Sequence, residues 1–374
     1  MPPRSHRILC LALAVVLGLG PTSALALLNI GGSRNQVFVF GNVRVGYDSN
    51  IFSSATAEDD TVITGSFGAE LRRKRGIIGV NSTVTLQYMK FSRFTDEGGF
   101  NPDFMLELTK STGRTTGELK LHAFRSNRAD SAVNLRTTSW NIPLDLSVRY
   151  PINEKLYVAS ATSYLRRDYV EDAQLVDYVD YSQGFDVFYV YNSRIDLLAG
   201  YRFRHSDTLV GQSRDHSFTL GVTGGIFPKV TGTVRLGYQL RRTLQTGRED
   251  DQITISTSLN WVPTRKLSVE MGVSRDFTIT ALGDSVDTLG ASAHATYSMN
   301  RRLEFDAGVS YGRNRFLGTT PRTDDFLEWS ASARYTLNEH LTVAGTYSHL
   351  ENWSTASFSD FTRTGYSLDI SSRF

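Results

Sequence analysis

The sequence contains a single cysteine, Cys10, and no apolar run after about residue 20 that is long enough to form a membrane-spanning helix. Because Cys10 falls within an N-terminal apolar stretch, the rest of the chain has no thiol, which excludes disulfides there. The missing apolar run excludes helical membrane proteins, and sustained helical periodicity is lacking as well. A β-barrel is not excluded by the mean hydropathy of −0.24, since half of each barrel strand faces a polar lumen.

A surplus of charge is lacking as well. The chain has 40 Lys and Arg residues against 38 Asp and Glu residues. Two of the cations, Arg4 and Arg7, belong to the N-terminal leader described next, so the remainder carries 38 charges of each sign. A nucleic-acid partner would require a basic surplus, and the sequence therefore predicts none.

The N-terminus has the pattern of a secretory signal peptide. Arg4 and Arg7 form a short positive region, residues 8–20 are apolar, and Ala24-Leu25-Ala26 offers small residues at a cleavage site. The apolar run is too short to cross a bilayer as a helix. The sequence therefore predicts a signal peptide over residues 1–26, cleaved near Ala26, and export of the chain to the cell outer membrane.

Apolar and polar residues alternate along most of the remaining chain. Successive side chains of a strand point to opposite faces, so each alternating segment predicts a strand with one apolar and one polar side. The clearest example is a segment whose apolar-face positions are Ile253, Ile255, Thr257, Leu259 and Trp261.

Short turns and longer connections also alternate. Short turns are centred near residues 153, 193, 228, 264, 301 and 338. Longer polar connections cover residues 243–251, 280–287, 316–325 and 352–362. Short periplasmic turns with longer extracellular loops are typical of outer-membrane barrels. The sequence therefore predicts an all-β, transmembrane, antiparallel up-and-down barrel of about 18 strands. Sixteen strands remain an alternative, because the alternation is unclear between residues 92 and 137.

This barrel is predicted to be a single domain over residues 37–374, preceded by a short periplasmic lead over 27–36. The last strand carries apolar residues at alternate positions and ends in an aromatic residue, Phe374, which resembles the signal read by the barrel-assembly machinery. Expected partners are that machinery, outer-membrane lipid and lipopolysaccharide, and a polysaccharide is an open possibility. Aromatic residues beside the short turns predict an interfacial girdle. They are Tyr150, Tyr157, Tyr189, Tyr191, Phe227, Trp261, Tyr297 and Tyr335.

Charged residues on the polar faces are the candidate functional residues, because a barrel of this size encloses an aqueous interior. Their charges would select solutes by charge and size. The alternative is that they pair with one another and stiffen the wall. The predicted lumen-lining residues are Asp145, Arg149, Asp196, Arg202, Arg204, Arg235, Arg241, Glu270, Glu304 and Asp306, with Asp276 and Arg313. Arginines at 202–204 and 235–241 favour anionic solutes, whereas the later acidic residues argue against that preference.

No catalytic, cofactor or metal site is predicted. The histidines lack metal-ligand spacing. Gly308-Val309-Ser310-Tyr311-Gly312 matches the G-x-S-x-G pattern of hydrolases, but that motif needs a strand-to-helix elbow, and Ser310 falls within an alternating strand.

The segment Val43-Arg44-Val45-Gly46-Tyr47-Asp48-Ser49-Asn50-Ile51-Phe52 resembles the opening strand of the putative β-barrel porin family of the second type. The blocks at 199–204 and 236–241 resemble the Gly-Tyr-x-x-Arg repeats of the same group. The resemblance implies an outer-membrane barrel, and many family members are associated with exopolysaccharide synthesis and export.

The sequence thus favours a channel, either a porin or the conduit or accessory barrel of an exopolysaccharide export system. A non-conducting scaffold barrel and an outer-membrane lipid-modifying enzyme are the alternatives. A conduit for an anionic polymer should have a lumen lined mostly by Arg and Lys, whereas a general porin should carry opposite charges.

Overall fold

The computed structural model describes residues 28–30, 35–73, 76–170, 174–318 and 321–374. The predicted signal peptide and its cleavage site at Ala26 lie outside these residues. None of the helices in this part of the chain is long and apolar enough to cross a membrane.

Long strands dominate the described chain, joined by connections that include two short 3-10 helices, η1 (Thr95–Glu97) and η2 (Ser357–Ser359). The first strands are β1 (Leu28–Ile30), β2 (Asn35–Asp48), β3 (Asp60–Arg73), β4 (Gly79–Phe91), β5 (Gly99–Lys110), β6 (Thr116–Asp130), β7 (Leu135–Pro151), β8 (Leu156–Tyr169), β9 (Tyr178–Val190) and β10 (Ile195–Thr208). The others are β11 (Gly211–Phe227), β12 (Val230–Thr243), β13 (Glu249–Thr264), β14 (Leu267–Ile279), β15 (Ser285–Ser298), β16 (Leu303–Phe316), β17 (Arg322–Thr336), β18 (Leu341–Ser354) and β19 (Phe361–Arg373).

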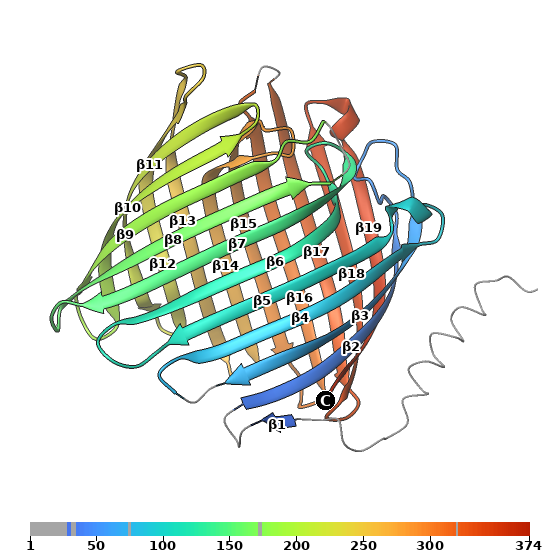
Figure 1. Ribbon diagram of the computed structural model, residues 1–374, viewed down its shortest axis with the longest axis horizontal. Coiled ribbons are helices and arrows are strands. Elements are labelled where there is room, and N and C mark those ends of the chain that lie inside the picture. The colour runs from blue at the N-terminus through green and yellow to red at the C-terminus, as the bar shows by residue number, and fades with distance from the viewer. Residues whose placement is uncertain (1–27, 31–34, 74–75, 171–173, 319–320) are drawn as a thin grey trace, which may run out of the picture.

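Strands β2 to β19 form one closed antiparallel sheet (Figure 1). Each strand pairs with the next in sequence, and β19 returns to pair with β2 in the register Tyr366 with Tyr47. The closed sheet has 18 strands, which confirms the predicted fold class and excludes the alternative of 16. The region between residues 92 and 137, unclear in sequence, contains β5, β6 and the start of β7.

The two ends of the barrel differ. At one end, called the turn end, lie the C-terminus and the short connections (Figure 1). An asparagine shapes four of these turns: its Oδ1 accepts hydrogen bonds from the backbone N–H groups two and three residues later, which closes a tight turn without further residues. These residues are Asn153, Asn192, Asn300 and Asn338. The opposite end carries the longer connections and is called the loop end.

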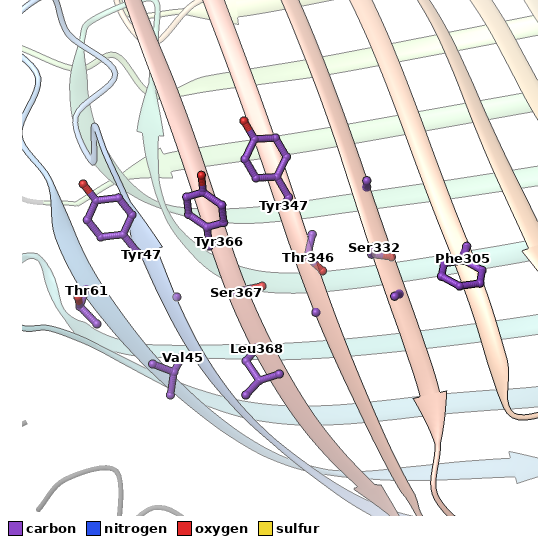
Figure 2. A pocket seen from close by; sticks show the side chains of 14 residues that line it. Val45, Tyr47, Thr61, Phe305, Ser332, Thr346, Tyr347, Tyr366, Ser367 and Leu368 are labelled. Atoms are coloured by element: carbon purple, nitrogen blue, oxygen red, sulfur yellow. The ribbon is translucent and has the colours of Figure 1, made fainter. Parts of the chain in front are cut away.

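The faces of the wall follow the alternation in sequence. On β12, the side chains of Leu236 and Tyr238 are 54% and 46% exposed, whereas Gln239 and Arg241, at positions of the other parity further along the strand, are buried. The exposed apolar face points outward and the polar face points into the lumen. Figure 2 shows part of the outward surface, where the rings of Tyr47, Tyr347 and Tyr366 lie side by side with their hydroxyls directed towards the loop end.

One residue of the predicted girdle faces the other way. Tyr157 points into the lumen, where its ring stacks on Phe188 at 4.5 Å and its hydroxyl donates to Asp196 at 2.7 Å. Together with Leu198 these two rings form a small apolar cluster inside the wall. Tyr157 therefore belongs to the lumen and not to the girdle.

The short strand β1 lies within the segment predicted as a periplasmic lead. It pairs with β2 through Ile30 and Asn35, on the edge of β2 beyond the point where β19 ends. At the end of β19, Phe374 and Val39 are joined by two backbone hydrogen bonds of 2.8 and 2.9 Å, and no residue of β19 pairs with β2 before Val39. β1 thus occupies strand edge that the end of β19 leaves unpaired, and the sheet begins at Asn35.

Candidate functional site

The hairpin formed by β6 and β7 extends beyond its neighbours at the loop end. Pairing with β5 stops at Phe124, and pairing with β8 stops at Ser139, whereas β6 and β7 remain paired to Asp130 and Leu135. The six residues of β6 after Phe124 span about 20 Å at 3.3 Å per residue. This free length allows the tip of the hairpin, residues 131–134, to cross the mouth of the barrel.

Arg322 holds the tip from the opposite side. It lies at the start of β17, which is almost diametrically opposite β7 in the closed sheet. Its guanidinium donates to the carbonyl oxygens of Ser131 and Ala132, both at 2.9 Å. The same group is fixed by Asp324, whose Oδ1 lies 2.8 Å from the Nε, and its side chain is only 9% exposed. We call this contact the latch.

The turn within the tip is fixed by Asn134, which adopts a positive φ of 56°. Asparagine tolerates this backbone conformation better than most residues. Its side chain donates to the carbonyl oxygen of Ser53 at 2.5 Å and accepts from the hydroxyl of Ser359. The tip therefore contacts the β2–β3 and β18–β19 connections as well as β17.

The sequence motif at residues 48–52 builds the surface that receives the hairpin. Asp48 binds Arg363 through contacts of 2.6 to 3.1 Å, which ties β2 to β19. Asn50 is fully buried and bonds to the carbonyl oxygens of Ser54 and Thr362. The carbonyl oxygen of Ile51 then accepts from Arg136 of the hairpin at 3.2 Å. The motif that resembles a family's opening strand thus binds the β6–β7 hairpin.

Arg136 shows that the hairpin bends inward. By alternation its side chain should point out of the barrel, yet it is 6% exposed and lies over the ring of Phe91, which faces the lumen, at 4.6 Å. It also approaches Glu97 of η1 at 3.7 Å. Burial raises the pKa of Glu97, although the nearby guanidinium opposes part of this effect. The nominally outward face of the hairpin therefore packs on the inner wall.

A second hairpin, β14–β15, bends inward in the same way. Pairing of β14 with β13 stops at Arg275, and the following residues pair only with β15. Phe277, nominally outward, is 1% exposed and lies under Arg241 of the inner wall at 4.7 Å. The tip reaches the β8–β9 connection, where the N–H of Val176 donates to the carbonyl oxygen of Ala281 at 2.8 Å.

A buried ion network anchors this second hairpin. Asp215 on β11 lies between two arginines of the inner wall, 2.7 Å from the Nε of Arg204 and 2.7 Å from the Nε of Arg241. Arg204 also contacts the carboxylate of Asp276 at 3.2 Å and the carbonyl oxygen of Phe277 at 2.8 Å. Because each buried charge has a partner, the network holds β14 against the wall.

Beneath the latched hairpin lies a cavity of about 560 Å³. Its lining combines the β6–β7 hairpin with residues of β2, β3, β4, β17, β18 and β19. Arg44 and Arg363 in this lining bind Asp369 and Asp48 respectively. Arg128 and Glu328, both exposed, have no ion-pair partner among the described residues and come from walls far apart in the sheet. The cavity is thus polar, with one free charge of each sign.

The ten lumen-lining residues of the sequence analysis lie on inward faces, most of them in contacts. Arg202 joins the network through Asp276 at 2.9 Å, and Arg235 binds Asp186 at 2.8 Å across two intervening strands. Two of the other residues contact Tyr157: Arg149 lies over its ring at 3.7 Å, and Asp196 accepts from its hydroxyl. Glu304 binds Arg334 at 2.6 Å, and Asp306 accepts a hydrogen bond from Thr296 at 2.9 Å. The last two are paired in register with basic residues of the neighbouring strand, Asp145 with Lys120 and Glu270 with His294.

One residue named with this set faces away from the lumen. Arg313 has the opposite parity to Glu304 and Asp306 and lies beside Tyr311, where both bind Asp325 on the outward surface. The alternation along β16 alone places it outward. The sequence did not predict the latch between Arg322 and the carbonyl groups of Ser131 and Ala132, because nothing in a turn sequence signals which distant wall it will contact.

The described residues hold neither a metal-ligand cluster nor a hydrolase-type elbow at the G-x-S-x-G pattern. Among the described residues, no group of three or more His, Cys, Asp or Glu side chains is placed to hold a metal ion. Ser310 of the G-x-S-x-G pattern lies within β16, opposite Ser292 and Glu328, and not on a strand-to-helix elbow.

Comparison with solved structures shows the same fold in Pseudomonas aeruginosa channels of the Occ/Opd group. OccK5 (OpdH) matches with a TM-score of 0.51 and 9% identity, covering 91% of this chain and 98% of its own. OccK2 (OpdF) in complex with glucuronate matches at 0.52 and 12%, with the same coverage. OpdO matches at 0.50 and 11%, covering 91% and 97%. At these identities the likeness concerns the fold.

No curated protein matches the sequence. The opening motif at residues 43–52 lies outside the part of the chain that a family model matches. The contacts of that motif are therefore assigned from the structure alone. The family resemblance is confirmed over strands β11 to β19, because residues 212–374 match the model of the family described as Putative beta-barrel porin 2.

Proposed function

We propose that this barrel is an outer-membrane channel for small hydrophilic solutes, narrowed at its loop end by the two inward hairpins. The observation that carries the proposal is the polar cavity under the latched hairpin, where Arg128 and Glu328 form no ion pair with any residue that the structure describes. Free charges of opposite sign across a hydrated passage create a transverse field that favours polar solutes over apolar ones.

The lumen is less suited to the passage of an anionic polymer. Most inward arginines, such as Arg204 and Arg241, are already neutralised by carboxylates and hold the second hairpin in place. A passing polyanion would therefore meet few free cations. A role in exopolysaccharide export rests on the family resemblance and would require the β6–β7 hairpin to leave the mouth.

Export and assembly belong to the same proposal. A chain cleaved near Ala26 and inserted by the barrel-assembly machinery through its last strand would reach the outer membrane with the loop end outside. N-terminal sequencing of the protein from an outer-membrane fraction should begin at Leu27. A start at Met1 would contradict this part of the proposal.

Single-channel recording in planar bilayers tests the channel directly. The full-length mature chain should give steady current steps in potassium chloride, and Arg322→Gln, which weakens the latch, should give larger steps. Arg313→Gln is the matched control, because it removes an arginine from the outward surface and should leave the steps unchanged. Glucuronate, found in the OccK2 complex, is a suitable first solute for block of the current.

Two results would overturn the channel. If folded barrels of both the unmodified chain and Arg322→Gln insert without conducting, the scaffold alternative is correct. If the purified barrel hydrolyses phospholipid and Ser310→Ala abolishes that activity, the enzyme alternative is correct.

A further inference from the structure

An outward-facing row of basic residues at the loop end has fewer bound counter-charges than the other arginines of the same rim. The row consists of Arg214 on β11 and Arg242 on β12, with His205 on β10 beside Arg214, and these residues are paired directly in register. We call it the cation row. Its orientation is fixed by the neighbouring positions, because Asp215 and Arg241, next along the same strands, are buried in the lumen network.

Like charges in directly paired positions repel each other. Paired side chains on one face of antiparallel strands have Cβ atoms only about 5 Å apart, and like charges there destabilise the sheet. The side chain of Arg214 has no hydrogen bond or ion pair within the described residues. Arg242 has only Glu249, at 3.9 Å, and both of these side chains are mostly exposed. The guanidinium of Arg214 is therefore left without a bound counter-charge, beside a second guanidinium that is only loosely paired.

Other outward arginines at the loop end are each neutralised or bonded. Arg166 binds Asp168 at 2.9 Å and Arg313 binds Asp325 at 2.7 Å. Arg125 donates to the carbonyl oxygen of Phe100 at 2.7 Å. The cation row departs from this arrangement, and its third member adds an unsatisfied group, since Nδ1 of His205 is shielded from solvent and has no partner.

The aromatic residues next to the cation row indicate its level relative to the membrane. Towards the turn end on the same three strands lie Tyr201, Phe203, Phe218 and Tyr238, all outward, with Tyr201 and Phe218 in ring contact at 5.0 Å. Aromatic belts mark the boundary between hydrocarbon and headgroups. The cation row follows directly beyond this belt, at the level where the phosphates of outer-leaflet lipid lie.

We infer that the cation row binds a phosphate group of an outer-leaflet lipid, of the kind carried by the lipid A part of lipopolysaccharide. Two guanidinium groups side by side can donate several charge-assisted hydrogen bonds to one phosphate, which also relieves their mutual repulsion. The acyl chains then lie along the apolar surface of β10 to β12 below. The nearby carboxylates of Asp207 and Glu249 reduce the positive potential but leave Arg214 without a partner. This site is independent of conduction.

Native mass spectrometry of the detergent-purified barrel tests the inference with diphosphorylated lipid A as the probe. The double variant Arg214→Gln/Arg242→Gln should lower the affinity about thirtyfold, since each basic residue near a membrane surface contributes about fivefold to the binding of anionic lipid. The matched control Arg166→Gln/Arg313→Gln removes two outward loop-end arginines that have their own carboxylates. It should retain the affinity of the unmodified barrel.

Two further measurements test whether the site recognises the phosphate groups of a lipid and not phosphate alone. Fully dephosphorylated lipid A should bind about as weakly to the unmodified barrel as diphosphorylated lipid A binds to the double variant, and inorganic phosphate at equal concentration should not displace the lipid. Equal affinity of the unmodified barrel and the double variant would overturn the inference. So would an equal loss in the control, equal binding of dephosphorylated lipid A, or displacement by inorganic phosphate. If the double variant does not fold, the single variants Arg214→Gln and Arg242→Gln provide the same comparison.

Discussion

The guanidinium of Arg204 lies 3.2 Å from the carboxylate of Asp276, although three strands of the wall separate β10 from β14. Two residues this far apart around a cylinder can meet only if one strand leaves the wall. β14 does so after Arg275, and the same departure by β6 and β7 produces the latched hairpin. The constriction of this barrel is therefore built from its own strands.

Weakening the latch should loosen the β6–β7 hairpin. Arg322→Gln removes the two hydrogen bonds to the tip and leaves the carboxylate of Asp324 without its cation. Trypsin cleavage after Arg128 and Arg136 should become about tenfold faster, which corresponds to a loss of about 1.4 kcal/mol in local opening free energy. The control Arg313→Gln should be cleaved at the rate of the unmodified chain, and an unchanged rate in Arg322→Gln would show that the latch does not hold the tip.

The two acids of the buried network should differ in their contribution to stability. Asp215→Asn leaves two buried guanidiniums facing each other and should cost about 3–5 kcal/mol. Asp276→Asn should cost less, because its carboxylate is 30% exposed and Arg204 keeps Asp215. The temperature at which the barrel loses its folded mobility on an unheated gel measures both. A larger loss in Asp276→Asn would contradict the proposed order.

Replacement of Gly200 should destabilise the barrel, because a side chain there would disturb an ion pair between two other strands. A Cβ at this position would lie 2.1 Å from Oδ1 of Asp186, the carboxylate that binds Arg235. Gly200→Ala should therefore break this ion pair and cost about 1–3 kcal/mol. Gly290→Ala, on the inward face of β15 with its nearest contact at 3.8 Å, is the control and should change stability by less than about 0.5 kcal/mol.

The two free charges of the cavity should act in opposite directions on ion selectivity. Arg128→Gln removes a cation from the passage and should shift the reversal potential in a salt gradient towards cation preference. Glu328→Gln should shift it towards anion preference. Shifts of the same sign in both variants would show that the solute path avoids this cavity.

Docking of the β6–β7 hairpin should weaken as the pH rises. Burial raises the pKa of Glu97, so the docked state favours its protonated form. This contribution is fully present below the ordinary pKa of a glutamate and is lost as the pH rises through the raised value. The ratio of the trypsin cleavage rate of the unmodified chain to that of Glu97→Gln, where the group cannot ionise, should rise over that interval, since the ratio removes the pH dependence of trypsin itself.

Local patterns in the sequence account for the wall. Alternation along β12 and β13 assigned their inward and outward faces, because the two-residue period of a strand is a local property. The turns at Asn153 and Asn338 follow from side chains that bond their own backbone. The strand count was less certain only between residues 92 and 137, where β6 and β7 serve both the wall and the hairpin.

The same alternation failed where strands leave the wall. Arg136 and Phe277 have outward parity, yet both are buried on the inner wall, because an inward-bent hairpin lays its outer face on the inner face of nearby strands, β4 and β12 respectively. The sequence by itself determined a closed sheet with an apolar outside and a polar inside, since those depend on neighbours along the chain. Only the tertiary structure decided which arginines are neutralised and where the lumen narrows, because these contacts join strands far apart in sequence across the barrel.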